Sequence, residues 1–337
     1  MDMGCCYLGL QLKNPLVASS SPLTGDIESI RQLEKAGIAA IVLPSLFEEN
    51  LASDLSLGKA ALDFDFSEAV FNAANMQAQP CVSHLEQYLE KIRTIKKTSE
   101  VPLIASLNGH SMSGWITHAR QLEEAGCDAL ELNFYHIAAD VYETAAEIEA
   151  QYVLLLDALR NHIRIPITVK LTSQHTSLAN YIQQLKDSGA AGVVLFNRFY
   201  QPLINLDTLK LEPTLLLSSP NETQERIRWI ALLSRKINLS FAATGGFHKT
   251  EDILRAVLAG TDAVYMCSAL LQQGPGLISN VLDEMARWLE KKNYSSLQEI
   301  KGRLSQDSLV QEEASLYARS NYVSVLQNYQ VSPIKSV

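Results

Sequence analysis

Hydrophobic positions recur along the chain in a repeated unit, in which a helix pattern ends at a glycine and a short apolar run follows. The four glycines favour helix ends, because glycine adopts the left-handed backbone there most easily. Each run is apolar at nearly every position, which is typical of parallel strands buried on both faces. The four copies are Leu33–Ser45, Leu122–Phe134, Leu185–Asn197 and Val257–Ala269, with glycines Gly37, Gly126, Gly189 and Gly260.

Short β-rich runs of a second kind, each preceded by a proline or a short loop, lie between these units. Together the two sets predict eight strands, and helical patterns separate nearly all of them. Eight β/α units favour an α/β fold of the TIM (β/α)8 barrel type in a single domain, residues 1–337; a doubly wound sheet suits this regularity less well. The predicted strands are 16–19, 40–44, 103–107, 129–133, 167–171, 193–197, 240–243 and 263–267.

Two long segments interrupt the rhythm, after predicted strands 2 and 6. Phe47–Ser83 and Arg198–Asn221 are both too long for simple loops, and the second carries two short β-like runs around Leu209-Lys210. Long loops at the carboxyl ends of barrel strands usually cover a ligand, although a subunit contact explains Phe47–Ser83 nearly as well. A C-terminal helical extension, about residues 286–325, is expected to pack on the outside of the barrel.

Small residues follow the last two predicted strands. Thr244-Gly245-Gly246 ends strand 7, and Cys267-Ser268 ends strand 8. Glycine lets backbone N–H groups approach an anion closely, and loops after strands 7 and 8 of such barrels often bind phosphate. The sequence therefore predicts a phosphorylated ligand.

Composition narrows the class of partner. The chain has 337 residues, is 47% hydrophobic and 19% charged, and carries a formal net charge of −9. This describes a soluble globular protein and argues against nucleic acid and against anionic membrane surfaces as partners. The N-terminus lacks a signal-peptide pattern, and no apolar run reaches the ~18 residues of a membrane span. The five cysteines are scattered without a C-x-x-C pair, so we expect a cytoplasmic protein with neither disulfide framework nor metal site.

Polar residues at the predicted strand ends are the candidates for binding. Lys170 stands inside an apolar strand, where its charge needs a partner such as a phosphate or an electron-rich ring; the alternative is a side chain that extends to solvent. Asn133 and Asn197 end strands 4 and 6 and are suited to hydrogen bonding a heteroaromatic ligand, although asparagine is also common in turns.

Five motifs, in order, resemble those of the dihydroorotate dehydrogenase family, especially its soluble class 1 branch. They are NPLVASS (Asn14–Ser20), ELN (Glu131–Asn133), VKL (Val169–Leu171), TGG (Thr244–Gly246) and CSAL (Cys267–Leu270), and the C-terminal KKNYSSLQEIKGRL is similar as well. The resemblance implies a homodimeric FMN enzyme of pyrimidine biosynthesis that oxidises dihydroorotate, or a related CH–CH substrate, and passes electrons to a soluble acceptor.

The resemblance also implies roles for particular residues. Substrate is expected at Asn72, Asn133 and Asn197, with Asn75 as the alternative to Asn72. FMN is expected at Ala18, Ser19, Asn108, Asn133, Lys170, Ser218, Ser219, Thr244, Gly245, Gly246, Cys267 and Ser268.

Several positions depart from the family pattern around the substrate. The position of the family's Ser or Cys base holds His136, its second substrate asparagine is Ala138, and its lysine after strand 2 is Pro44. The family's glycine-rich run before helix 6 is replaced by LLLSSPN, which carries Ser218 and Ser219. The flavin contacts are thus retained better than the substrate contacts.

His136 has side-chain chemistry suited to a general base, and packing in a substrate lid is an equally good interpretation. The function predicted first is therefore an FMN-dependent oxidoreductase with His136 as base. The altered base motif keeps a second hypothesis open, a flavin-binding regulatory or partner protein with little turnover. The net charge and the lack of a cysteine after strand 4 disfavour tRNA-dihydrouridine synthesis.

Overall fold

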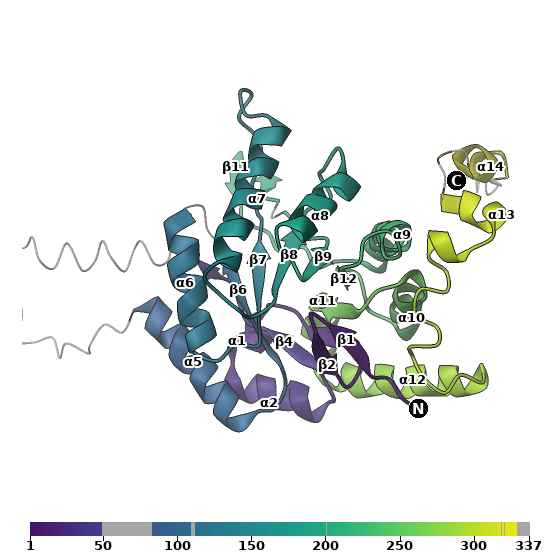
Figure 1. Ribbon diagram of the computed structural model, residues 1–337, viewed down its shortest axis with the longest axis horizontal. Coiled ribbons are helices and arrows are strands. Elements are labelled where there is room, and N and C mark those ends of the chain that lie inside the picture. The colour runs from purple at the N-terminus through teal and green to yellow at the C-terminus, as the bar shows by residue number, and fades with distance from the viewer. Residues whose placement is uncertain (49–82, 109–111, 200, 318, 320, 329–337) are drawn as a thin grey trace, which may run out of the picture.

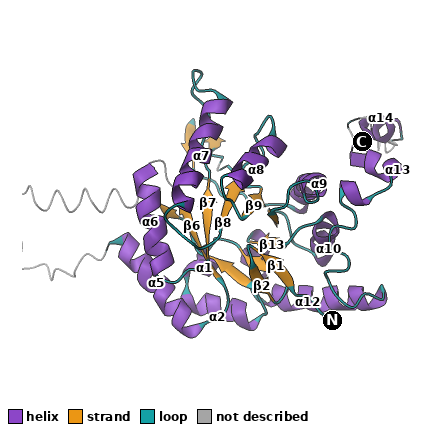
Figure 2. Ribbon diagram, in the orientation of Figure 1, coloured by secondary structure: helices purple, strands orange, loops and turns teal. Residues whose placement is uncertain are grey.

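Eight parallel strands form a closed barrel in the computed structural model, which describes residues 1–48, 83–108, 112–199, 201–317, 319 and 321–328 (Figures 1 and 2). The predicted TIM barrel is confirmed, and each predicted strand is present within two residues of its expected bounds. The strands are β3 (Leu16–Ala18), β4 (Ala40–Val42), β6 (Leu103–Asn108), β7 (Ala129–Asn133), β8 (Ile167–Leu171), β9 (Gly192–Leu195), β12 (Ser240–Thr244) and β13 (Ala263–Met266).

Parallel pairing runs around the barrel in the order β4-β3-β13-β12-β9-β8-β7-β6, and β6 pairs again with β4. The closing register places Ile41 opposite Leu103. A two-residue strand, β5 (Leu46–Phe47), continues the pairing along β6 beyond β4. Because all eight strands point the same way, their carboxyl ends and the loops that follow meet at one end of the barrel.

Helices surround the strands, as Figure 2 shows. The glycines that end the repeated units have left-handed backbone, with φ from +96° at Gly189 to +116° at Gly260. The α-helices are α1 (Pro22–Gly25), α2 (Ile27–Lys35), α5 (His84–Thr98), α6 (Met112–Glu124), α7 (Ala145–Arg160), α8 (Leu178–Asp187), α9 (Thr223–Leu233), α10 (Thr250–Ala259), α11 (Ser268–Gln273), α12 (Gly276–Lys291), α13 (Gln311–Ala314) and α14 (Asn321–Gln327). The 3₁₀ turns are η1 (Pro220–Glu222), η2 (Gln306–Ser308) and η3 (Ser315–Tyr317).

Alternate residues of each strand enter two different cores. On β7, Leu130 and Leu132 join the large core between strands and helices, whereas Ala129 belongs to the smaller core inside the barrel. The same alternation places Glu131 on the inner side. Because both faces of each strand are buried, the strand sequences are apolar at nearly every position.

An N-terminal hairpin packs against the inner core. Its strands are β1 (Cys5–Tyr7) and β2 (Leu10–Leu12), which pair antiparallel. Tyr7 is fully buried, and its hydroxyl lies 3.0 Å from the Tyr265 hydroxyl and 3.4 Å from Thr168 Oγ1. Tyr7 of the hairpin thus extends into the barrel interior and contacts β8 and β13.

The two predicted excursions differ in outcome. Residues 198–221 contain an antiparallel hairpin, β10 (Leu203–Asn205) with β11 (Lys210–Glu212), so the expected pair of short β runs is confirmed. Residues 49–82 of the other excursion, including Asn72 and Asn75, lie outside the described residues.

The C-terminal extension begins earlier than its expected start at residue 286, which falls within α12. Met285 and Leu289 of α12 are buried in the outer core, whereas α13 and α14 lie at the periphery beyond α9 and α10 (Figure 1). Among the described residues, no helix combines the length and the apolar character that crossing a membrane requires.

Candidate active site

A cavity of about 330 Å³ opens at the carboxyl ends of the barrel strands. We call it the glycine-loop cavity, after Gly245 and Gly246. Of the twelve residues predicted to bind FMN, eight line it, namely Ser19, Lys170, Ser218, Thr244, Gly245, Gly246, Cys267 and Ser268. Its other lining residues are Ser20, Ser21, Pro22, Phe196, Asn197, Arg198, Leu215, Leu216, Leu217, Phe247, His248, Tyr265, Ala269 and Leu271.

The remaining predicted residues lie outside this lining. Ala18 and Ser219 are neighbours in sequence of the lining residues Ser19 and Ser218. Asn133 is buried and bound to other side chains: its Nδ2 donates to Ser45 Oγ at 2.9 Å and to Ser106 Oγ at 2.7 Å. Its Oδ1 accepts from Asn197 Nδ2 at 3.5 Å, and Asn197 is a predicted substrate residue that does line the cavity. Asn108 ends β6 without reaching the cavity.

Ser218 ties three loops together at the cavity wall. Its hydroxyl accepts a hydrogen bond from Gly246 N at 3.0 Å and donates to Ser268 Oγ at 2.8 Å. Its backbone N–H also donates to Ser268 Oγ, at 3.0 Å. Because these three residues follow β11, β12 and β13, the bonds hold the three segments against one another at the cavity wall.

Gly246 cannot be replaced by a larger residue without rearrangement. Its φ is +87°, and an added Cβ would lie 2.5 Å from Ser219 O and 3.0 Å from Thr223 Cγ2. Glycine is therefore needed both for its backbone angle and for the close approach of two loops. The Ser268 hydroxyl accepts both bonds from Ser218 and keeps its own proton to donate, so a glycine turn and a hydroxyl donor that fit a phosphate stand side by side.

A buried ion pair lies at the floor of the glycine-loop cavity. Lys170 is 9% exposed and Glu131 is 0% exposed; Lys170 Nζ lies 3.6 Å from Glu131 Oε1. Neither carboxylate oxygen of Glu131 has a hydrogen-bond partner among the described residues. Burial raises the pKa of the Glu131 carboxyl, and the nearby Lys170 charge opposes that rise. The Lys170 side chain thus stays inside the barrel mouth, where its charge would stabilise negative charge on a bound ring.

His136 faces a different space. It lines a cavity of about 160 Å³, the histidine cavity, together with Phe134, Ala138, Glu143, Ala145, Ile148, Glu149, Tyr152, Thr172, Gln174, His175, Thr176 and Tyr181. Its Nε2 lies 2.8 Å from Glu143 Oε2. In this arrangement His136 is paired with an acid and is not among the residues that line the cavity of Lys170.

Several residues of the mouth were not predicted. Glu131 carries the same signal as Lys170, a charged residue within an apolar strand. Arg198 directly follows the strand-end Asn197, so its position was also readable from the sequence. His248 and Arg226 had no such signal: the first binds Ser218 O through Nε2 at 2.8 Å, and the second reaches the mouth from α9.

The fold and the site define a (β/α)8 barrel with glycine loops and a buried lysine at its open end. The family model described as dihydroorotate dehydrogenase matches residues 5–289, and the chain belongs to this family. Its members are flavoproteins and oxidoreductases that act on CH–CH groups, so the chain is a member of an enzyme family.

Curated relatives align along most of their length, at low identity. A dihydroorotate dehydrogenase B (NAD(+)) catalytic subunit from Thermoplasma acidophilum is 22% identical over 89% of this chain and 98% of its own. A protein of the same description from Methanosarcina acetivorans is 26% identical over 87% of this chain and 93% of its own. A relative from Aeropyrum pernix, provisionally named dihydroorotate dehydrogenase A (fumarate), is 28% identical over 89% and 97%.

Proposed function

We propose that the protein is an FMN-dependent oxidoreductase of the dihydroorotate dehydrogenase type, acting in pyrimidine biosynthesis on dihydroorotate or on a related CH–CH substrate. The observation that carries this proposal is the joint lining of one cavity by Lys170 and by the glycine loops after β12 and β13. A phosphate cradle and a buried ammonium group within one cavity match the two ends of a flavin mononucleotide.

The cofactor would be held by residues that the structure already orders. Its phosphate would lie against the glycine turn at Gly246 and accept from the Ser268 hydroxyl, which Ser218 holds in place, and Lys170 would lie against the ring. Bound FMN would supply a hydride acceptor. The substrate loses a hydride from one carbon of its CH–CH bond and a proton from the other, and His136 is proposed to receive that proton. Lys170 would stabilise the negative charge that the ring gains.

Absorbance spectroscopy tests this function directly. Protein purified with FMN, or reconstituted with it, is expected to show the visible spectrum of bound oxidised flavin. Anaerobic dihydroorotate is then expected to bleach that spectrum. A protein that stays colourless after reconstitution contradicts the FMN proposal, whereas a yellow protein that dihydroorotate fails to bleach contradicts only the choice of substrate.

Replacement of His136 by alanine tests the proposed base. If His136 removes the substrate proton, flavin reduction by substrate is expected to slow by about 10²–10⁴-fold, the usual contribution of a positioned base, with FMN content unchanged. Stopped-flow bleaching measures the rate. His175→Ala is the matched control, because His175 lines the same histidine cavity and pairs with Glu149 at 3.4 Å. Equal rates in both variants would assign the proton to another group.

The position of His136 also favours a second candidate function. Because its ring is bound to Glu143 in the histidine cavity, the chain fits a flavin-binding partner or regulatory protein with little turnover. Steady-state oxidation of a substrate that disappears in His136→Ala would refute this candidate.

Assembly and electron acceptor follow from the family only as proposals. We propose a cytoplasmic homodimer. Its electron acceptor is proposed to be a soluble molecule, since the names of two relatives contain NAD(+) and fumarate. Sedimentation of the holoprotein tests the dimer, and reoxidation of the bleached flavin by each acceptor tests the second point.

A further inference from the structure

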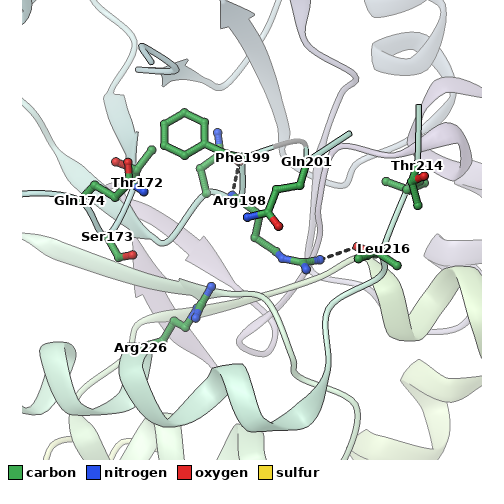
Figure 3. A pocket seen from close by; sticks show the side chains of 11 residues that line it. Thr172, Ser173, Gln174, Arg198, Phe199, Gln201, Thr214, Leu216 and Arg226 are labelled. Carbon is green, nitrogen blue, oxygen red and sulfur yellow. Dashed lines mark hydrogen bonds between the residues drawn. The ribbon is translucent and has the colours of Figure 1, made fainter. Parts of the chain in front are cut away.

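A second cavity of about 300 Å³ adjoins the glycine-loop cavity and carries two arginines (Figure 3). We call it the arginine cavity. Among the described residues, its lining contains hydroxyl and amide side chains but no Asp or Glu. The lining residues are Thr172, Ser173, Gln174, Asn197, Arg198, Phe199, Gln201, Thr214, Leu215, Leu216 and Arg226. Small-molecule sites usually measure ~300–1,000 Å³, so this cavity alone has room for part of a ligand.

The two cavities share a wall. Asn197, Arg198, Leu215 and Leu216 line both. A ligand held beside Lys170 can therefore extend past Asn197 into the arginine cavity.

Arg226 is fixed in place by its neighbours. It is 6% exposed, its Nε donates to Thr244 O at 3.1 Å, and its Nη1 donates to Glu222 O at 2.9 Å. Burial lowers the pKa of its guanidinium, while Glu222 and Glu225 oppose that change. The group is paired with Glu225 Oε2, 3.2 Å from Nη1, and it anchors Glu222, whose carboxylate lies 3.4 Å from Nη2.

The guanidinium of Arg198 has N–H groups that are not taken up by hydrogen bonds within the described residues. Its side chain is 39% exposed, and it stands in the middle of the view in Figure 3 with its guanidinium directed toward Leu216. Nη1 donates to Leu216 O at 2.6 Å, and Nε lies 3.1 Å from Glu222 Oε2. A guanidinium has five N–H donors, so three of them have no acceptor among the described residues. Such a fork suits the two oxygens of a carboxylate or phosphate.

We propose that the arginine cavity binds an oxyanion carried by the substrate, with Arg198 as the contact residue and Arg226 as the positioning residue. The substrate class is then a ring compound with an acidic group that points toward the ends of β8 and β9. Pro44, two residues beyond β4, stands where the family resemblance leads one to expect a lysine, so a cation for the acid would have to come from elsewhere in the barrel mouth. That the oxyanion belongs to a substrate rests on the proposed function; the oxyanion site itself does not.

Paired ligands that differ only in the acidic group test this site. Orotate differs from uracil by a carboxylate on the ring. Uridine 5′-monophosphate differs from uridine by a phosphate on the ribose. Calorimetric titration of the FMN-saturated protein is expected to show at least one acid binding about tenfold or more tightly than its neutral partner. Arg198→Gln is expected to bring that ratio below about twofold, with affinity for the neutral partner unchanged.

Two further variants distinguish hydrogen bonding by the planar guanidinium from the effect of positive charge alone and from a general effect on folding. Arg198→Lys keeps the charge but loses the planar fork, so an intermediate ratio is expected. Arg228→Gln, on the exposed face of α9 where Nη2 binds Tyr317 O, is the matched control and should leave both ratios unchanged. Lack of acid preference in both wild-type pairs, or a preference that survives in Arg198→Gln, overturns the proposal.

The test of the oxyanion site does not require bound flavin. If the protein takes up no FMN, the proposed function fails, and the orotate and uracil titrations are run on the flavin-free chain. An acid preference that depends on Arg198 would then still support the oxyanion site, and its absence would still overturn it.

Discussion

Lys170→Met is expected to lower the free energy of unfolding by about 3–5 kcal/mol near pH 8, because removing one partner of a buried ion pair leaves the other charge uncompensated. The orphaned group is Glu131, which is fully buried and has no hydrogen-bond partner among the described residues. Chemical denaturation of the flavin-free protein measures the change. Lys97→Met, an exposed lysine on α5, is the control and should cost less than about 0.5 kcal/mol.

The deficit of Lys170→Met should shrink as the pH falls. Burial raises the pKa of Glu131 in the folded state above its unfolded value. A carboxyl of this kind favours folding below its unfolded pKa, and that contribution is lost as pH rises through the folded pKa. Without Lys170 the folded pKa rises further, so the variant takes up the proton more readily than wild type. A deficit that is constant between pH 8 and pH 5 would contradict this account.

A double substitution distinguishes the contribution of the ion pair to stability from that of side-chain packing. Glu131→Gln combined with Lys170→Met removes both charges and should recover much of the stability that Lys170→Met loses. The coupling between the two sites, obtained from the double-mutant cycle, should exceed about 1 kcal/mol because the groups are in direct contact. Additive effects would show that the two side chains act independently.

Gly246→Ala is expected to have the second large effect, on stability and on FMN binding together. At a φ of +87° an alanine is strained by about 1–2 kcal/mol, and its Cβ would meet Ser219 O at 2.5 Å. Relief requires the loops after β11 and β12 to separate, which breaks the contact between Gly246 N and Ser218 Oγ. We expect FMN affinity to fall at least tenfold, as measured by fluorescence titration.

Gly274→Ala provides a matched comparison. Gly274 also has a positive φ, +77°, but an added Cβ would meet no atom within 4 Å. Its replacement should cost the backbone strain alone and leave FMN affinity unchanged. If both alanine variants bind FMN like wild type, the close approach at Gly246 is not part of the cofactor site.

Most of the barrel was predictable because its signals are local. Parallel strands buried on both faces leave continuous apolar runs, and glycines with positive φ end the helices before them. The hairpin of β1 and β2 was missed, since strands of three residues are too short to show a period. The start of α12 was placed ten residues late, at 286 instead of 276.

The candidate site was predictable in the parts that lie at strand ends. Lys170 and Thr244 lie in the last two residues of their strands, Gly245 and Gly246 come directly after Thr244, and all four line one cavity. Asn133 also ends a strand, but its amide is taken up by Ser45 and Ser106 on neighbouring loops and strands. Whether a strand-end side chain faces a ligand or another side chain depends on the neighbours that the register supplies.

The sequence by itself determined the barrel, the glycine loops and an unusual lysine in an apolar strand. Only the tertiary structure decided which side chains contact one another. The pairing of β7 with β8 puts Glu131 beside Lys170, and the path of α9 brings Arg226 into the same cavity as Arg198. The loop after β7 places His136 against Glu143. The physical reason is that a residue's own surroundings in sequence fix whether it is buried and how its backbone bends. Its partners across the barrel are fixed by strand register and loop path, which short-range patterns do not encode.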